Sequence, residues 1–161
     1  MLKYVDTLVS FSEIPDEISL CINISNCPHN CICCHSPYLK QDIGENLTIE
    51  KLDELITANR GISCVCFMGG DSDPMYINRL AFGVKIISDK KLKVAWYSGN
   101  TDISDDIDPQ FFNYIKKGLY IAGYGPLTSP TTNQVMYQIV DGNFENITYK
   151  FHKYDTKTSI Q

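Results

Sequence analysis

Residues 48–70 read TIEKLDELITANRGISCVCFMGG, and the change of pattern inside this stretch decides the fold class. The first part places apolar residues on one helical face, with Thr48 as the expected N-cap and Gly61 as the expected end of the helix. The second part, the apolar run at 62–68, is typical of a strand buried on both faces, as parallel sheets require. A helix that leads directly into such a strand predicts an α/β fold.

The alternation of strands and helices continues on both sides of this stretch. ISLCINIS at 18–25 alternates apolar and polar residues and predicts a strand. Further along the chain we expect a helix over 75–87, a strand in LKVAWYS at 92–98, a short helix in FFNYIKK at 111–117 and a strand in GLYIAGY at 118–124. This order predicts βαβ units, whose active sites lie where the parallel strands end.

The chain is short for the barrel that such units can build. A closed eight-unit barrel takes about 250 residues, whereas this chain has 161. We therefore expect a small open partial (β/α) barrel with a mainly parallel sheet, formed by a single domain over residues 1–161. Beyond a Pro/Ser/Thr-rich stretch, QVMYQIV at 134–140 and NITYKFHKY at 146–154 predict two more strands in an antiparallel finish.

Composition narrows the range of partners and compartments. With 14 basic and 19 acidic residues, the formal net charge is -5, and no basic run interleaved with aromatics is present, so we do not expect nucleic acid as a partner. No stretch has the roughly 20 apolar residues of a membrane span, and the N-terminus lacks a signal-peptide pattern. Seven cysteines, four of them within 27–34, are typical of a reducing compartment, so we expect a cytoplasmic protein without a membrane partner.

The cysteine-rich stretch after the strand at 18–25 carries the chemistry. Cys27, Cys31 and Cys34 lie at spacings of four and three residues, and thiolates are the usual ligands of iron–sulfur clusters. Three protein ligands would leave one iron of a four-iron cluster open to bind substrate. A zinc site is the alternative, in which His29, His35 or Cys64 would supply the fourth ligand.

The C-x3-C-x2-C pattern resembles that of the radical S-adenosylmethionine (radical SAM) enzymes, and CPHNCICCHSP at 27–37 closely resembles the small activating proteins of anaerobic ribonucleotide reductase. The resemblance implies that Cys27, Cys31 and Cys34 bind a 4Fe-4S cluster, and that the amine and carboxylate of S-adenosyl-L-methionine chelate its open iron. It also implies that Cys33 and His35, beside Cys34, line the cofactor rather than bind iron.

Two later turns are expected at the same edge of the sheet. Gly69, Gly70 and Asp71 resemble the Gly-Gly-Asp-Pro-type motif of the activating proteins, although here Ser72-Asp73 precedes Pro74. The resemblance implies that this turn holds the methionyl amine, and that Ser98, which ends the strand at 92–98, contacts the cofactor's sugar or methionine end. The alternatives are a helix-capping turn and an ordinary turn.

Two other groups of residues bear on the extent of this site. Thr131, Thr132, Asn133 and Gln134 resemble a family segment that borders the cofactor or the docking surface, against the alternative of a solvated loop. Cys64 and Cys66 lie two apart on an apolar strand and are predicted to be small core residues.

The function implied is that of an oxidoreductase that cleaves S-adenosyl-L-methionine and generates a glycyl radical on a glycyl-radical enzyme, anaerobic ribonucleotide reductase. A low-potential electron donor such as flavodoxin would be the second partner. Two alternatives remain open: a small radical SAM enzyme acting on a metabolite or peptide, and a non-enzymatic iron–sulfur electron-transfer protein with a fourth protein ligand, for which Cys33 is a candidate.

Overall fold

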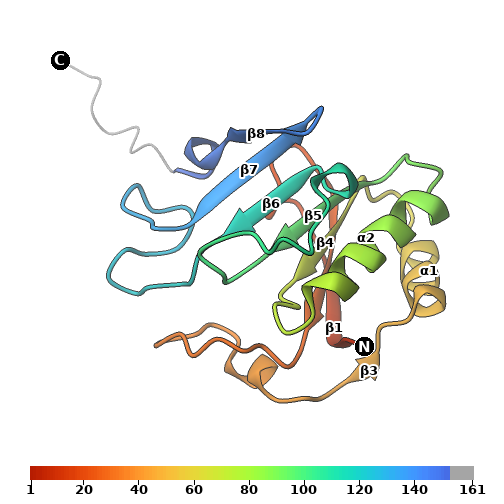
Figure 1. The fold of residues 1–161 in the computed structure, drawn as a ribbon, viewed down its shortest axis with the longest axis horizontal. Coiled ribbons are helices and arrows are strands. Elements are labelled where there is room, and N and C mark those ends of the chain that lie inside the picture. Colours follow the sequence, from red (N-terminus) through yellow and green to blue (C-terminus); the bar gives the residue numbers. More distant parts are fainter. Residues whose placement is uncertain (153–161) are drawn as a thin grey trace.

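The computed structural model describes residues 1–152, and within them eight strands form one open, mixed sheet with two α-helices (Figure 1). The strand order across the sheet is β3-β1-β2-β4-β5-β6-β7-β8. The strands are β1 Lys3–Ser10, β2 Ser19–Ile24, β3 Glu45–Asn46, β4 Cys64–Met68, β5 Lys93–Tyr97, β6 Tyr114–Lys117, β7 Val135–Val140 and β8 Asn143–Asn146; the helices are α1 Ile49–Ala58 and α2 Pro74–Ile87.

The α/β class is confirmed, but the expectation of a mainly parallel sheet is wrong. Only β2, β4, β5 and β6 run parallel, while β1, β3, β7 and β8 pair antiparallel at the two sides. The physical reason lies in the connections, because antiparallel neighbours need no crossover helix. The turn at Asp141 and Gly142, with φ of 51° and 76°, is a short connection of this kind between β7 and β8.

The two faces of the sheet are covered differently. Both helices pack on one face, over alternate residues of the central strands such as Val65, Phe67 and Trp96 (Figure 1). The opposite face carries the second set of alternate residues, among them Cys21, Cys64 and Cys66. Residues from two loops, Ile14 and Leu127, and from the segment after β8 pack against this face. The structure therefore buries Cys64 and Cys66 in a core, as predicted from their spacing.

Three sequence predictions after residue 110 are wrong. Residues 111–117 do not form a helix: Pro109–Phe111 makes one 3-10 turn, and Tyr114–Lys117 pairs with strands on both sides as β6. Residues 118–124 form turns rather than a strand, starting at Gly118 with φ of 106°. The strand predicted at 146–154 is a 3-10 turn over Thr148–Phe151, and its last two residues lie outside the described part of the chain.

The other predicted elements are confirmed, and α1 shows how local sequence sets its boundary. Thr48 has extended backbone angles, and its side chain accepts a hydrogen bond from the Lys51 amide at 3.1 Å. Leu52, which is part of this helix, is fully buried. Within residues 1–152, no helix has both the length and the apolar character needed to cross a membrane.

Replacing Thr48 by Ala is expected to lower the free energy of unfolding by about 1 kcal/mol, because the Lys51 amide loses its acceptor at the helix N-terminus. Urea denaturation followed by circular dichroism measures this change. Thr57→Ala, at an exposed position of the same helix, is the matched control and should leave stability nearly unchanged. Equal losses in the two variants would contradict the capping role.

Candidate functional site

Three turns meet at the carboxyl edge of the parallel strands. The cysteine loop, defined here as residues 25–36, follows β2; the glycine turn at 69–73 follows β4; and the turn at 98–100 follows β5. Because β2, β4 and β5 are adjacent and parallel, these segments begin side by side. The loop at 118–134, after β6, starts at the same edge, and Figure 1 shows it at the same end of the sheet as the cysteine loop.

The Asp71 carboxylate joins these turns. Its Oδ1 accepts hydrogen bonds from Ser98 Oγ at 2.6 Å and Asn100 Nδ2 at 3.3 Å. Its Oδ2 accepts from the Gly99 amide at 2.9 Å and lies 3.0 Å from His29 Nε2 in the cysteine loop. These four protein groups fill the acceptor positions of the carboxylate, and the Asp71 side chain is only 2% exposed to solvent.

Gly99 is needed for the same contact. A Cβ atom at this position would lie 2.4 Å from His29 Cδ2 and 2.8 Å from Nε2, so the imidazole sits directly against the Gly99 backbone. His29 therefore joins the cysteine loop to the turns after β4 and β5 by one hydrogen bond and one close packing contact. The start of the loop is joined to β1 by the Ser25 amide, which donates to the Lys3 carbonyl at 3.0 Å.

The other residues of the two predicted turns have different surroundings. Ser98 is buried, donates to Asp71 and accepts from the Asn100 amide at 3.0 Å. Gly69 lies against the end of β2, where a Cβ would be 3.3 Å from the Ile24 carbonyl oxygen, and it lines a cavity together with Cys27 and Cys34. Gly70 faces the core instead, because its Cβ would lie 2.4 Å from Ile77 Cδ1. Only Gly69 of these three lines a cavity beside the cysteines.

The three predicted cluster ligands are all free thiols of intermediate exposure. Cys27 and Cys34 line one cavity of about 180 Å³, and Cys31 borders a neighbouring one of about 360 Å³. Each of the three thiols therefore borders open space rather than a packed core.

Partial burial raises the pKa of the Cys27 thiol. A hydrogen bond from the His29 backbone amide lowers this pKa, and the charges of Asp71, Cys31 and Cys34 raise it further.

Cys33 differs from these three. It is exposed and has φ of 61°, a left-handed backbone conformation that is uncommon for residues other than glycine. His35 is also exposed, and its ring packs against Tyr120 with centroids 4.6 Å apart. Within residues 1–152, no three His, Cys, Asp or Glu side chains converge on the position of a single metal ion.

The candidate fourth zinc ligands have other contacts. His29 bonds to Asp71, and His35 packs against Tyr120. Cys64 is the first residue of β4 and is fully buried, so it lies at the amino edge of the sheet, whereas Cys27 follows the carboxyl end of β2. The structure thus separates Cys64 from the cysteine loop.

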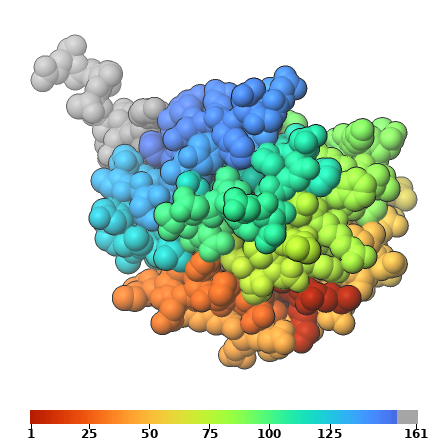
Figure 2. All heavy atoms as spheres, viewed as in Figure 1, coloured from red at the N-terminus to blue at the C-terminus, as the bar shows by residue number. Residues whose placement is uncertain are grey.

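A cavity of about 600 Å³ lies between the cysteine loop and the loop at 118–134. Cys34 and His35 form one wall, and Lys116 and Gln134 contribute buried polar groups. The full lining is Ser12, Glu13, Cys34, His35, Ser36, Met68, Tyr97, Lys116, Tyr120, Pro126, Leu127, Thr128, Gln134 and Phe151. The space-filling view shows the cysteine loop, in orange, in contact with the teal and cyan atoms of the loop at 118–134 (Figure 2).

Sequence reasoning missed several of these residues. Lys116 was expected on a short helix, so its place on a central strand facing the cavity was not foreseen. Met68 and Tyr97 lie at the ends of correctly predicted strands, and their position before a turn was an available signal. Of the residues 131–134, Gln134 lines the cavity, whereas Thr131 is exposed and bonds to the Tyr124 carbonyl.

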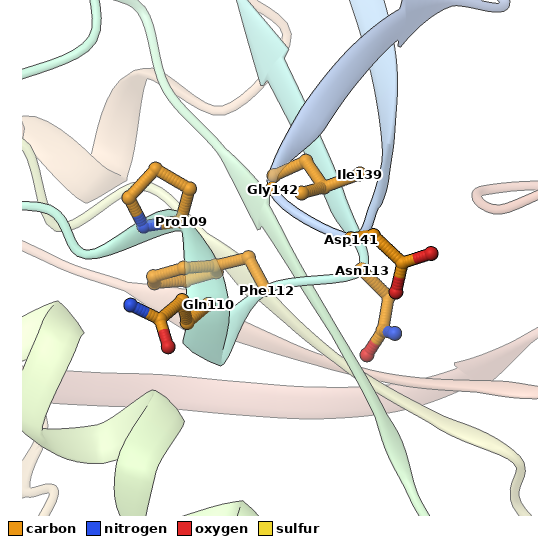
Figure 3. Close-up of a pocket in the computed structure, with 7 residues that line it drawn as sticks. All are labelled: Pro109, Gln110, Phe112, Asn113, Ile139, Asp141 and Gly142. Atoms are coloured by element: carbon orange, nitrogen blue, oxygen red, sulfur yellow. The ribbon is translucent and has the colours of Figure 1, made fainter.

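A further cavity of about 550 Å³ lies away from the cysteines. Figure 3 shows it between the 3-10 turn before β6 and the β7–β8 turn, lined by Pro109, Gln110, Phe112, Asn113, Ile139, Asp141 and Gly142. Pro109, Gln110, Phe112 and Asn113 precede β6, and the carboxyl end of the antiparallel β7 lies beside them. The cavity is therefore at the amino edge of the parallel strands, opposite the cysteine loop. Its lining contains no thiol or imidazole group.

Comparison of the chain with protein-family models, with curated proteins and with solved structures finds no match in any of the three.

A double-mutant cycle tests the contact between His29 and Gly99. Gly99→Ala should lower the free energy of unfolding by about 1–3 kcal/mol, because the added methyl overlaps the imidazole while the backbone φ is acceptable for Ala. In a His29→Ala background the same substitution should cost much less, giving a coupling of at least about 0.5 kcal/mol in anaerobic urea denaturation. Additive effects would show that His29 does not lie against Gly99.

Proposed function

We propose that this protein is a radical SAM oxidoreductase that activates a glycyl-radical enzyme, with anaerobic ribonucleotide reductase as the partner. The observation that carries the proposal is the arrangement of the cysteine loop. Cys27, Cys31 and Cys34, spaced C-x3-C-x2-C, follow a parallel strand, and His29 and Asp71 hold their loop beside a cavity large enough for a cofactor.

The donor set fits a 4Fe-4S cluster. Cys27, Cys31 and Cys34 are free, part-exposed and border cavities, and a cubane takes one thiolate on each of three irons rather than three donors around one ion. With S-adenosyl-L-methionine bound and one electron supplied by an external donor, such a cluster would supply reductive cleavage of the sulfonium into methionine and a 5'-deoxyadenosyl radical, which can take a hydrogen atom from a carbon of the substrate. Cys33 lies outside this set because it is exposed and lines none of the cavities that Cys27, Cys31 and Cys34 border.

The surrounding residues position and shield the cofactors in this proposal. His29 and Asp71 orient the cysteine loop, and Gly69 lines the cavity that Cys27 and Cys34 border. Met68, Tyr97, Leu127 and Phe151 give the large cavity an apolar wall that excludes water. We infer further that the helix-free face is the inner surface of a partial (β/α) barrel within a single domain of a cytoplasmic protein.

An apolar rim beside the site supports a protein substrate. Ile32 in the cysteine loop is 83% exposed, and Ile121 and Tyr124 across the neighbouring groove are also exposed. Exposed apolar side chains gathered at one site are typical of surfaces that a partner covers. A loop of the reductase would bring its glycine to the cavity here, and a donor such as flavodoxin would reduce the cluster.

The cavity itself keeps a second candidate function open. Its volume of about 600 Å³ lies within the range of small-molecule sites, so a radical SAM enzyme acting on a metabolite is also compatible with the geometry. The electron-transfer alternative requires a fourth ligand, for which Cys33 would have to turn inward. The two experiments below separate these functions.

Protein produced and purified without oxygen should be brown and contain about four irons and four sulfides per chain. Ala substitution of Cys27, Cys31 or Cys34 should abolish the cluster, whereas Cys33→Ala should retain it, with Cys64→Ala as a buried control. Iron and sulfide analysis with electron paramagnetic resonance measures the outcome. A colourless protein with one zinc, or loss of iron in Cys33→Ala, would contradict the ligand assignment.

The reduced protein, mixed with S-adenosyl-L-methionine and an anaerobic ribonucleotide reductase, should produce 5'-deoxyadenosine and a stable radical on the reductase. The doublet splitting of this radical should collapse when the α-hydrogen of the glycine is replaced by deuterium. Cys34→Ala should give neither product, because the cluster lacks one of its ligands. Cofactor cleavage without a protein radical would instead favour the metabolite-modifying enzyme.

A further inference from the structure

We propose that Lys116 and Gln134 form a carboxylate-binding subsite inside the cavity of about 600 Å³. The shared chemistry is a small organic carboxylate, which has two sources: the methionyl end of S-adenosyl-L-methionine, or a free organic acid used as substrate. The first source rests on the proposed function, whereas the second does not.

Lys116 is a buried cation without an acidic partner. It is only 8% exposed, and no carboxylate in the described part of the chain makes a salt bridge with it. Its Nζ donates to the Gly118 carbonyl at 2.8 Å and to the Ser98 carbonyl at 3.4 Å. An ammonium has three N–H donors, so one remains after these two bonds. Burying a charge in this way is costly unless a counter-charge is bound.

Gln134 supplies a second donor beside this ammonium. It is 7% exposed, and its Nε2 donates to the same Gly118 carbonyl at 3.3 Å, which leaves its other N–H for a ligand. The two side chains therefore converge on one backbone oxygen and line the same cavity. Two free N–H donors match the two oxygens of one carboxylate.

The rest of the cavity fits an organic acid of this kind. Met68, Leu127 and Phe151 contribute apolar groups to its lining. The Tyr97 ring centroid lies 5.8 Å from Lys116 Nζ. Burial lowers the pKa of Lys116 to about 8, against the opposing charges of Asp71 and Cys31, so the ammonium form predominates at pH 7. Glu13 also lines the cavity, but it makes no salt bridge with Lys116.

The test measures binding rather than turnover. Anaerobically reconstituted wild type, Lys116→Met and Gln134→Leu are titrated calorimetrically with S-adenosyl-L-methionine, with its decarboxylated analogue, and with propionate and succinate. Lys117→Met is the matched control, because the neighbouring side chain alternates to the other face of β6, where it lies 3.7 Å from Asp102. Thermal melts of each variant establish that it is folded.

If the carboxylate comes from the cofactor, Lys116→Met should weaken S-adenosyl-L-methionine binding about 10–100-fold and leave binding of the decarboxylated analogue unchanged, as expected for a charged hydrogen bond. Gln134→Leu should show the same pattern with a smaller loss, and Lys117→Met should show none. If the carboxylate comes from a free acid, the loss should appear with propionate or succinate instead.

Unchanged affinity for every carboxylate in both folded variants, or an equal loss for the decarboxylated analogue, would overturn the subsite. These outcomes differ from failure of the proposed function. In that case the wild type itself would lack the cluster or bind no S-adenosyl-L-methionine, while the organic acids would still test the subsite.

Discussion

The hydrogen bonds of the Asp71 carboxylate hold the site together. Four donors from two other segments converge on its two oxygens, and the carboxylate is almost completely removed from water. Loss of the acceptor would leave buried donors of Ser98 and His29 unpaired, at a cost of about 1–3 kcal/mol each. Because the cysteine loop is irregular in structure, this interaction and the packing of His29 on Gly99 keep it against the sheet.

This arrangement changes the interpretation of the glycine turn. The resemblance assigns the turn at Gly69, Gly70 and Asp71 to the cofactor's amine, yet in the structure the Asp71 carboxylate is occupied by protein donors, and a positioning role accounts for its contacts. Gly70 is likewise required by the core, where Ile77 leaves no room for a Cβ, rather than by a ligand. The chemical groups left facing open space are the cysteine thiols and the polar pair Lys116 and Gln134.

The local sequence pattern correctly predicted the elements whose residues strongly prefer one type of secondary structure. Thr48 caps α1 as expected, β4 matches the apolar run before Gly69, and β7 lies within QVMYQIV. The segment at 111–117 was misread because a Pro followed by mixed aromatic and lysine residues is compatible with a helix start. Tyr114–Lys117 forms a strand because it pairs with β5 and β7. This long-range pairing cannot be recognised from the neighbouring sequence alone.

The sequence by itself determined the α/β class, the order of its central elements and the three cysteines at spacings that suit one cluster, because spacing and periodicity are local properties of the chain. Only the tertiary structure decided that the sheet is mixed, that His29 bonds to Asp71 across 42 positions of sequence, and that Lys116 faces the cavity. Each of these depends on which strands become neighbours and on which face a side chain lies, and the long-range pairing and register of the strands determine both.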